Sequence, residues 1–343
     1  MKNIKSLSIS ELEKYFEEIG EKKYRTMQVF TWLWKKGIRS FEEMTDIKKE
    51  LRIKLSQEFY IFRLSKERIV KSKDGSIKFL FGTEDDKYIE SVFIPDKKRK
   101  TVCVSSQIGC SLKCKICRTG KDGFIRNLRF YEIAQQVVEI EKYVKEKITN
   151  VVFMGMGEPL LNIEDVLKAI EIVNHPSGLS IGKRHITVST AGVVPGIYEL
   201  ISRGIKQIKV AVSLNSPFND VRNLIMPINK KYPIEELLKS IKDFTKHTKK
   251  RVTIEYVLIK GLTDRQKDAK RLIKILKGIP LKINLIPYNK VKDERFETPG
   301  EKRVKQFAEL LYPYLPTVSI RKSKGQDIKS ACGQLRAFHK KNK

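Results

Sequence analysis

The stretch TVCVSSQIGCSLKCKIC (residues 101–117) joins a strand-like run to a loop that holds most of the chain's cysteines. Residues 101–109 carry several β-branched side chains, which predicts a strand. Cys110, Cys114 and Cys117 then follow with the spacing C-x3-C-x2-C. A cysteine loop directly after a strand suits an α/β fold, in which ligands bind beyond the carboxyl ends of parallel strands.

Strand-like and helix-like segments alternate through the rest of the chain. We expect strands at residues 101–109, 150–157, 185–192, 208–216, 252–259, 282–289 and 317–323, and amphipathic helices between them, such as residues 233–247. Repeated βα units predict an α/β fold with a parallel sheet, either doubly wound or curled toward a barrel. The polar segments GMGEP, STAG, SLNS and PYN follow strands, so they should meet at one edge of the sheet.

Two further regions precede this alternation. Residues 1–70 are expected to form a small helical accessory domain, whose first helix starts at a capping box of Ser8 and Glu11. Trp32 and Trp34 suit the core of this domain better than a base-stacking surface. Residues 71–100 alternate with period two, which predicts a β-hairpin extension. Residues 101–343 then form the third predicted domain.

Composition limits the class of protein. Of the 343 residues, 41% are hydrophobic and 32% are charged, which predicts a globular protein with a substantial core. The chain has no run of about eighteen apolar residues that would suit a membrane span. Its first residues lack an apolar signal core, so we expect a cytoplasmic protein. Five cysteines, an odd number, argue against a disulfide framework and favour metal binding or catalysis.

The charge balance points to a polyanionic partner. The formal net charge is +30, from 70 basic and 40 acidic side chains. Heat adaptation usually raises Glu together with Lys, which is not the pattern here. Basic clusters recur at residues 97–100, 249–251 and 340–341. Each cluster alone is compatible with a solvated surface, but the unbalanced total favours binding to nucleic acid.

Three neighbouring cysteines leave a metal site one ligand short. A structural zinc site normally has four closed ligands, and no histidine has finger-like spacing to this loop. Zinc with a distant fourth ligand is the lesser alternative. An iron–sulfur cluster fits better, because three cysteines can bind three irons of a 4Fe–4S cluster and leave the fourth iron open. An open iron favours catalysis over electron storage.

An ordered set of motifs resembles the RlmN/Cfr family of radical S-adenosylmethionine (SAM) RNA adenine methyltransferases. The motifs are CVSSQIGCSLKCKICRTGKDGFIRNL (103–128), VVFMGMGEPLLN (151–162), ITVSTAGVVPGI (186–197), IMPIN (225–229), INLIPYN (283–289) and DIKSACGQLRA (327–337). The resemblance covers about residues 88 to 338. It implies a partial (βα)6-type radical SAM barrel, one 4Fe–4S cluster, two SAM per turnover, and an electron donor such as flavodoxin or ferredoxin. The RNA substrates implied are 23S rRNA and tRNA.

The resemblance also implies roles for individual residues. Cys110, Cys114 and Cys117 would bind the cluster. Gly157 and Glu158 would bind the methionine part of SAM, although Glu158 alone could equally be a charge at a helix N-terminus. The ribose and adenine of SAM would lie against Ser189, Ser213, Leu214, Asn215 and Asn289. Asn215 departs from the family pattern, which usually has histidine there; asparagine can still donate and accept hydrogen bonds.

Two more cysteines and one glutamate complete the implied mechanism. Cys332 would accept a methyl group from one SAM, and a radical made from a second SAM would remove hydrogen from that methyl group. The resulting carbon radical would add to carbon 2 of adenine and form a protein–RNA thioether. Glu90 would remove the ring proton, and Cys103 would attack the Cys332 sulfur, which leaves a disulfide for thiols to reduce. From the residues alone, Cys103 could also be a packed core residue and Glu90 an outward-facing strand residue.

Two alternatives stay open. Carbon-8 methylation, as in the antibiotic-resistance branch of the family, is the nearer one; GMGEPL at residues 155–160 leans toward carbon 2, because some members of that branch have GMGEAL. A non-catalytic iron–sulfur protein that binds RNA and responds to redox state is the more distant one. It would need neither the SAM residues nor the two additional cysteines.

Overall fold

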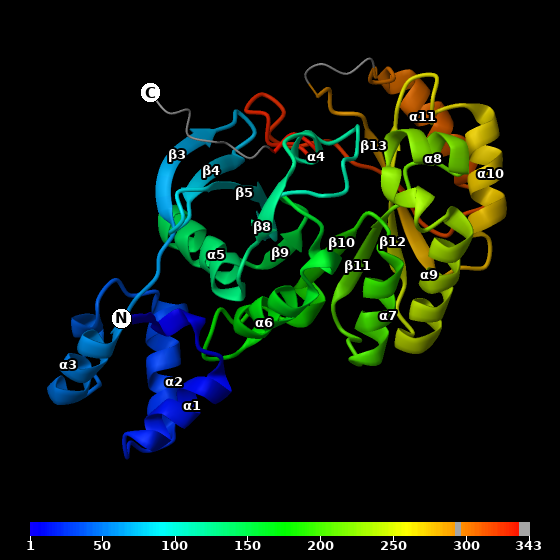
Figure 1. Ribbon diagram of the computed structural model, residues 1–343. Coiled ribbons are helices and arrows are strands. Elements are labelled where there is room, and N and C mark those ends of the chain that lie inside the picture. The colour runs from blue at the N-terminus through cyan, green and yellow to red at the C-terminus, as the bar shows by residue number, and fades with distance from the viewer. Residues whose placement is uncertain (292–295, 336–343) are drawn as a thin grey trace.

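One mixed sheet organises the computed structural model, which describes residues 1–291 and 296–335 (Figure 1). In those residues the sheet has the order β14-β13-β12-β11-β10-β9-β6-β5-β4-β3. Its parallel strands are β6 (Arg99–Cys103), β9 (Asn150–Phe153), β10 (Ile186–Thr190), β11 (Lys209–Ser213), β12 (Val252–Leu258), β13 (Leu281–Pro287) and β14 (Val318–Ile320). These strands follow the chain order with no reversal, whereas a doubly wound sheet requires a reversal. The sheet is therefore curled toward a barrel.

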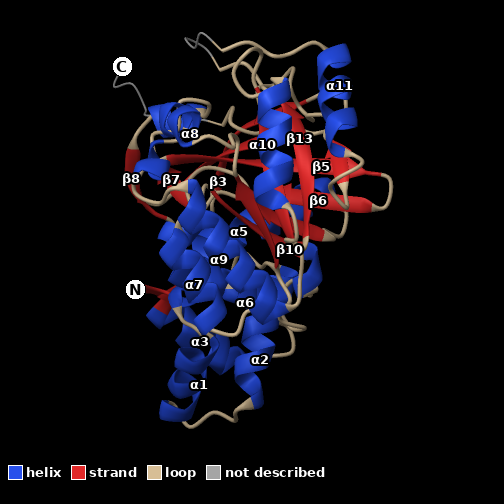
Figure 2. Cartoon of the chain, turned by 90° about the vertical axis from the view of Figure 1, so that its right-hand side faces the viewer, coloured by secondary structure: helices blue, strands red, loops and turns tan. Residues whose placement is uncertain are grey.

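The helices cover the outer face of this sheet (Figures 1 and 2). They are α5 (Phe130–Val144), α6 (Ile163–Asn174), α7 (Val194–Ser202), α9 (Ile234–Thr248), α10 (Gln266–Leu276) and α11 (Glu301–Leu311). Their apolar faces pack against strand residues; Tyr256 of β12, for example, stacks on Phe307 of α11 with ring centroids 5.8 Å apart. Crossovers of one hand place successive helices on one side, so the other face of the sheet is left for ligands.

Alternation along the strands makes the two faces chemically different. On β12, Ile254 and Tyr256 belong to the apolar outer face, so Thr253 and Glu255 point to the inner face. Residues paired across strands share a face, and Glu255 pairs with Ser213 and with Asn284. The inner face therefore carries polar side chains on neighbouring strands, although each of these strands is largely buried.

Three antiparallel strands extend the sheet beyond β6. They are β3 (Ser65–Lys71), β4 (Ile77–Gly82) and β5 (Tyr88–Asp96), and β5 pairs with β6. The turn between β3 and β4 contains Gly75, whose φ of +85° suits glycine, and Asp74 Oδ1 accepts a hydrogen bond from Ser76 N. The predicted hairpin is therefore part of a longer antiparallel extension of the barrel sheet.

The N-terminal helices form a separate layer against α5 and α6 (Figure 1). They are α1 (Ile9–Glu18), α2 (Tyr24–Thr31) and α3 (Lys49–Glu58), together with the π-helical turn η2 (Trp32–Lys36). The predicted capping box is confirmed: Glu11 N donates to Ser8 Oγ, and Ser8 N donates to Glu11 Oε2. The prediction that Trp32 and Trp34 are core residues is also confirmed, because both are buried.

The expected strands are present, but several are shorter than predicted: the strands expected at residues 150–157, 208–216 and 317–323 are Asn150–Phe153, Lys209–Ser213 and Val318–Ile320. The strand predicted at residues 101–109 ends at Cys103, and residues 107–109 form a separate strand, β7 (Gln107–Gly109), outside the main sheet. Ser105 separates the two, because its N–H donates to Gln136 Oε1 of α5 and its hydroxyl donates to Glu90 O. The boundaries predicted at residues 70 and 100 stay a prediction. Among the described residues no helix has the length and apolarity to cross a membrane.

Candidate active site

Several predicted site residues meet on the inner face of the barrel. Cys103 pairs with Val92, and Glu90 lies two residues from Val92 on the same face of β5. Cys103 also pairs with Val152 of β9, which pairs with Thr187 of β10, so Ser189 shares this face as well. The same register argument places Ser213 at the carboxyl end of β11 on the inner face.

The cysteine loop leaves β7 at the carboxyl edge of the barrel. Gly109 has a φ of +77°, and a Cβ there would lie 1.9 Å from Gly123 O, so the close pairing of β7 with β8 (Phe124–Asn127) requires glycine. Within the loop, Lys115 N donates to Ile225 O of α8 (Asn219–Ile225) over 2.9 Å. The loop is thus fixed at both its start and its middle.

The three loop thiols lie near one another in protein surroundings. Burial raises the pKa of Cys110 to about 12 and holds the pKa of Cys114 well above its ordinary value. The charge of Cys117 acts in the same direction on both thiols, which places the three within electrostatic range. Neighbouring thiols of this kind can bind a metal-containing group when they lose their protons. In the described ranges no three His, Cys, Asp or Glu side chains surround a single-ion site, and the donor set fits a thiolate-bound cluster.

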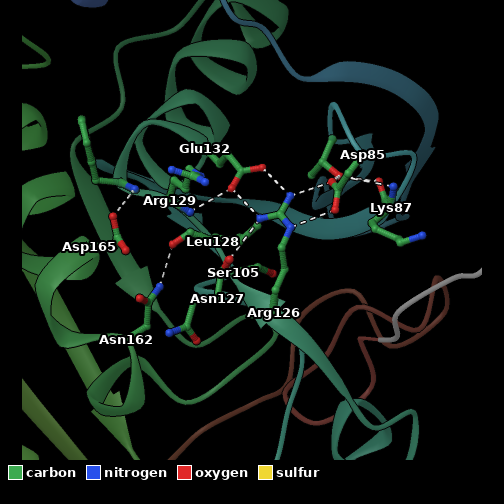
Figure 3. A network of polar contacts seen from close by, with 12 residues as sticks. Asp85, Lys87, Ser105, Arg126, Asn127, Leu128, Arg129, Glu132, Asn162 and Asp165 are labelled. Atoms are coloured by element: carbon green, nitrogen blue, oxygen red, sulfur yellow. Dashed lines mark hydrogen bonds and ion pairs between the residues drawn. The ribbon is translucent and has the colours of Figure 1, made fainter. Parts of the chain in front are cut away.

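An arginine network fixes the far end of the cysteine loop (Figure 3). Arg126 of β8 donates to Asp85 in the β4–β5 turn over 2.7 and 2.9 Å and to Glu132 of α5 over 2.8 Å. Hydrogen bonds from Arg126 hold the pKa of Asp85 well below its usual range. Asn162 Nδ2 also donates to Ser106 O and Leu128 O. The strand that follows the cysteines is therefore attached to three other parts of the fold.

The segment that carries Cys332 crosses the mouth of the barrel. Asn289 Nδ2 donates to Cys332 O over 3.2 Å, and Gly333 O accepts from Arg118 N over 2.7 Å. Arg118 begins α4 (Arg118–Lys121), directly after Cys117. Cys332 has exposed surface, yet the protein around it raises the pKa of its thiol to about 12. All five cysteines are free thiols.

Cys332 approaches the second predicted reactive cysteine. Burial raises the pKa of Cys103 to about 12, and the charge of Cys332 adds to this effect. The two thiols therefore lie within electrostatic range, although Cys103 is on β6 and Cys332 is in the segment after β14. The first parallel strand thus lies near a part of the chain that follows the last one.

Glu90 does not face outward. Its side chain is buried on the inner face, where its Oε1 lies 3.0 Å from Lys78 Nζ of β4. Lys78 Nζ also donates to Lys329 O over 3.3 Å, in the segment that carries Cys332. The ion pair with Lys78 holds the carboxylate of Glu90 on this face. Glu90 therefore has the chemistry of a base and lies on the same face as Cys103.

The GMGEP segment presents a second buried carboxylate. Gly157 has a φ of +97°, and a Cβ there would lie 2.5 Å from Gln107 Cβ, so only glycine fits. Glu158 Oε1 accepts from Leu160 N over 3.2 Å, and its Oε2 accepts from Ala191 N over 2.7 Å. Burial raises the pKa of Glu158 to about 7. Glu158 caps the short helix η4 (Pro159–Leu161) and also contacts the loop after β10.

The two asparagines predicted to contact SAM already have protein partners. Asn215 has a φ of +56°, a left-handed conformation that asparagine tolerates better than most residues. Its Oδ1 accepts from Val257 N and its Nδ2 contacts Met226 Sδ. Asn289 Oδ1 accepts from Gln326 Nε2. Leu214, between Ser213 and Asn215, is fully buried.

Two charged residues near the site were not predicted from the sequence. Arg222 of α8 is fully buried. Glu255 lies on the inner face of β12, where its Oε1 accepts from Asn284 Nδ2 over 2.8 Å and its Oε2 is buried without a hydrogen-bond partner. Burial raises the pKa of Glu255. A charged residue inside an apolar strand run is a signal that could have identified Glu255. Arg222 has no comparable signal, because arginine on a short helix usually faces solvent.

Two predicted basic clusters lie at the wrong edge to surround this site. Residues 97–100 cover the β5–β6 turn and the first two residues of β6, and residues 249–251 precede β12, so both lie at the amino ends of parallel strands. Lys100 also pairs with Glu146. The third cluster, residues 340–341, and the last two residues of the motif at 327–337 lie outside the described residues. The carboxyl edge has other exposed lysines, which are Lys113, Lys115, Lys290, Lys322 and Lys324.

Comparisons with known proteins agree with this geometry. The radical SAM superfamily matches residues 104–273, and the ribosomal RNA large subunit methyltransferase N-terminal domain matches residues 2–61. The probable dual-specificity RNA methyltransferase RlmN of Dictyoglomus turgidum is 45% identical over 346 residues, which cover 100% of this chain and 99% of that relative. The dual-specificity RNA methyltransferase RlmN of Geobacter sulfurreducens is 44% identical over 98% of this chain and 92% of its own length.

A solved structure has the same fold. The crystal structure of a radical SAM methyltransferase from Sphaerobacter thermophilus matches with a TM-score of 0.92 and 38% sequence identity. The match covers 98% of this chain and 99% of that one. It confirms the predicted α/β radical SAM fold with an N-terminal accessory region.

Proposed function

We propose that this chain, which belongs to the RlmN family of radical SAM RNA methyltransferases, forms 2-methyladenosine in 23S rRNA and in tRNA. The observation that carries the proposal is the convergence of Glu90, Cys103 and Cys332 at the mouth of the barrel. Two thiols and one carboxylate are the groups that a thiol-mediated route to an electron-poor ring carbon requires.

Membership of the radical SAM superfamily implies an iron–sulfur cluster and the use of SAM. We assign Cys110, Cys114 and Cys117 as the ligands of one 4Fe–4S cluster, because these thiols are buried together in one fixed loop. When bound, the cluster supplies the electron that cleaves SAM. Glu158 has a buried carboxylate beside the loop and is suited to hold the ammonium group of SAM.

The remaining SAM contacts are assigned to the inner face. Gly157 leaves space for close backbone approach, and Ser189 and Ser213 offer hydroxyl groups at the carboxyl ends of β10 and β11. Leu214, Asn215 and Asn289 complete the proposed set. Because the amides of Asn215 and Asn289 already bond to protein groups, their part is to shape the ribose and adenine site as much as to contact it.

The reaction uses the two reactive cysteines in sequence. The Cys332 sulfur accepts a methyl group from one SAM and, after hydrogen is removed from that methyl group, carries the carbon to adenine carbon 2. Radical addition leaves one unpaired electron on the adduct, which the iron–sulfur cluster would take back, and Glu90 would remove the ring proton. The Cys103 thiolate then attacks the Cys332 sulfur, the bond between that sulfur and the transferred carbon breaks, and this carbon takes up a proton to become the methyl group. The two cysteines are left as a disulfide, which external thiols reduce. This disulfide is a turnover intermediate, consistent with the free thiols of the present state.

The proposal includes the partners of the reaction. An electron donor of the flavodoxin or ferredoxin class reduces the cluster, and the reaction takes place in the cytoplasm. The net charge of +30 supports RNA as substrate. Residues 1–70 form an accessory domain that assists RNA docking, residues 71–100 extend the sheet, and residues 101–343 contain the catalytic domain.

Mass spectrometry of nucleosides tests the product directly. Digests of 23S rRNA and tRNA from cells with and without the gene should differ in 2-methyladenosine, and both RNA classes should lose it when the gene is absent. A gene-dependent 8-methyladenosine would replace carbon 2 by carbon 8 in the proposal. If no methylated adenosine depended on the gene, the proposed reaction would be wrong.

A further inference from the structure

Arg222 ties together the carboxyl ends of two barrel strands. Its Nε donates to Leu214 O over 2.9 Å, and its Nη2 donates to Ala191 O over 2.6 Å and to Ser213 O over 3.2 Å. Ala191 follows β10, and Ser213 ends β11. Its Nη1 donates to Asn229 Oδ1 over 2.8 Å. One guanidinium thus orders both loops proposed to hold SAM.

The charge of Arg222 has no carboxylate partner in the part of the chain that the structure describes. All four hydrogen-bond acceptors are neutral, and the side chain is fully buried. Placing an uncompensated ion in the interior costs several kcal/mol. The cysteine loop lies within electrostatic range of Arg222. A negatively charged cluster held by that loop would supply the missing counter-charge.

The helix that carries Arg222 contacts this loop directly. Ile225 O accepts the hydrogen bond from Lys115 N, and Met226 N donates to Arg222 O over 2.7 Å. Ile225 and Met226 also form a small apolar core against which Cys114 and Ile116 pack. Arg222 is therefore one helical turn from the contact between α8 and the loop.

We infer that Arg222 is a positioning residue that supplies a buried positive charge beside the iron–sulfur cluster and thereby raises its reduction potential. The inference rests on the proposed cluster ligands. Reduction adds one negative charge to the cluster, and a neighbouring cation stabilises the reduced form more than the oxidised form. Three thiolates alone would make the cluster harder to reduce. Arg222 thus brings the potential toward the range of a cellular electron donor.

Redox titration of the reconstituted protein tests this role without measuring turnover. The variants are Arg222→Gln, which removes the charge, and Arg222→Lys, which keeps it but loses the fork of hydrogen bonds. We expect Arg222→Gln to shift the equilibrium between the reduced and oxidised cluster by about tenfold, which is about 59 mV downward for one electron. Arg222→Lys should shift this redox equilibrium less than threefold, and it should lower the melting temperature of the protein. The matched control is Arg203→Gln, on an exposed arginine at the end of α7.

The outcomes separate this inference from the proposed function. If the wild-type protein reconstitutes no iron, the assigned ligands are wrong. If wild-type and Arg222→Gln both hold a full cluster with the same potential, only the role of Arg222 is wrong, even if SAM binding weakens. If Arg222→Gln does not fold, Arg222→His gives the same information. The reduction potential of its cluster, relative to that of the wild type, should fall as the pH rises through the ordinary titration range of histidine. A constant difference between the two proteins would overturn the inference.

Discussion

Lys78 and Glu90 form a buried ion pair across β4 and β5, with 3.0 Å between Nζ and Oε1. The pair lies on the face that also carries Cys103, so a neighbouring strand holds the carboxylate assigned as the base in place. Removing one partner of a buried pair leaves an uncompensated charge, which typically costs about 3–5 kcal/mol. The pair therefore connects the stability of the sheet extension to the chemistry of the site.

Lys78→Met should impair removal of the ring proton. Without Lys78, the carboxylate of Glu90 loses the ion-pair partner that holds it on the inner face. The variant should accumulate a covalent protein–RNA adduct, seen on denaturing gels with labelled RNA. The exposed Lys71→Met on β3 serves as the control and should form no adduct. Normal turnover by a folded Lys78→Met variant would contradict the role given to the pair.

The division of labour between the two reactive cysteines is equally testable. Cys332→Ala should give neither product nor adduct, because the carrier sulfur is absent. Cys103→Ala should still add to RNA and then stop, because no thiol attacks the Cys332 sulfur. The trapped species should be sensitive to nuclease, and peptide mapping should locate the RNA on Cys332. RNA attached to any other residue would refute this sequence of steps. Glu90→Ala should trap a similar adduct.

Single alanine substitutions should identify the cluster ligands. After anaerobic reconstitution, Cys110→Ala, Cys114→Ala and Cys117→Ala should each lose the cluster absorbance and the bound iron. Cys103→Ala and Cys332→Ala are the matched controls, because they remove a thiol outside the loop triad, and they should keep both signals. Full iron content in any of the first three variants, or zinc in place of iron in the wild type, would reject the assignment.

Glu158 should make the stability of the SAM-free protein depend on pH. Burial raises the pKa of Glu158 from 4.5 to about 7. The folded state therefore binds more protons than the unfolded state between these values, and the contribution to stability decreases as the pH rises through this range. The wild type should lose about 3 kcal/mol of folding stability as the pH rises through this range, and Glu158→Gln should not show this loss. Urea unfolding at about pH 4.5 and pH 8 measures the difference between the variants.

The exposed Glu171→Gln on α6 controls for loss of one negative charge and should follow the wild type. Identical pH dependence in Glu158→Gln and wild type would mean that Glu158 is not desolvated in solution. In this pH range, the affinity for SAM should change with pH in the opposite direction to the folding stability. Its affinity should fall as the pH decreases through about 7, because protonated Glu158 cannot pair with an ammonium group.

RNA binding should depend on lysines at the carboxyl edge of the barrel. The double variant Lys322→Gln with Lys324→Gln should weaken tRNA binding. The slope of the logarithm of the binding constant against the logarithm of the salt concentration should become smaller by about 1.4, because each phosphate contact on a single strand contributes about 0.7. Lys97→Gln with Lys98→Gln removes the same charge from the opposite edge and should leave the slope unchanged. Equal effects of the two double variants would indicate that only total charge matters.

Local sequence patterns predict much of the fold, but they do not predict features that depend on contacts between distant segments. The strand from residue 150 and the helix at residues 233–247 were predictable because alternation and amphipathic period are local properties. The break after Cys103 was not, because it depends on hydrogen bonds from Ser105 to Glu90 and to a helix far along the chain. The spacing of Cys110, Cys114 and Cys117 marks them as candidate metal ligands, and that assignment stays a prediction.

The buried charged residues of the site were harder to predict from the sequence. Nothing local distinguishes the buried Arg222 from a solvated arginine, because its partners are carbonyl groups on two other elements. The position of the basic clusters, in contrast, could have been predicted. Residues 249–251 directly precede a strand, so in a parallel sheet they had to lie at the edge away from the ligands.

The segment with Cys332 has a consequence for synthesis of the protein. It contacts the β3–β4 turn through Ser72 and Asp74 and the cysteine loop through Arg118, so it spans regions made early in translation. Every strand of the barrel has been translated before these contacts can form. Domains fold progressively as the ribosome delivers them. The segment with Cys332 consequently takes its place only after all the strands of the barrel have been made.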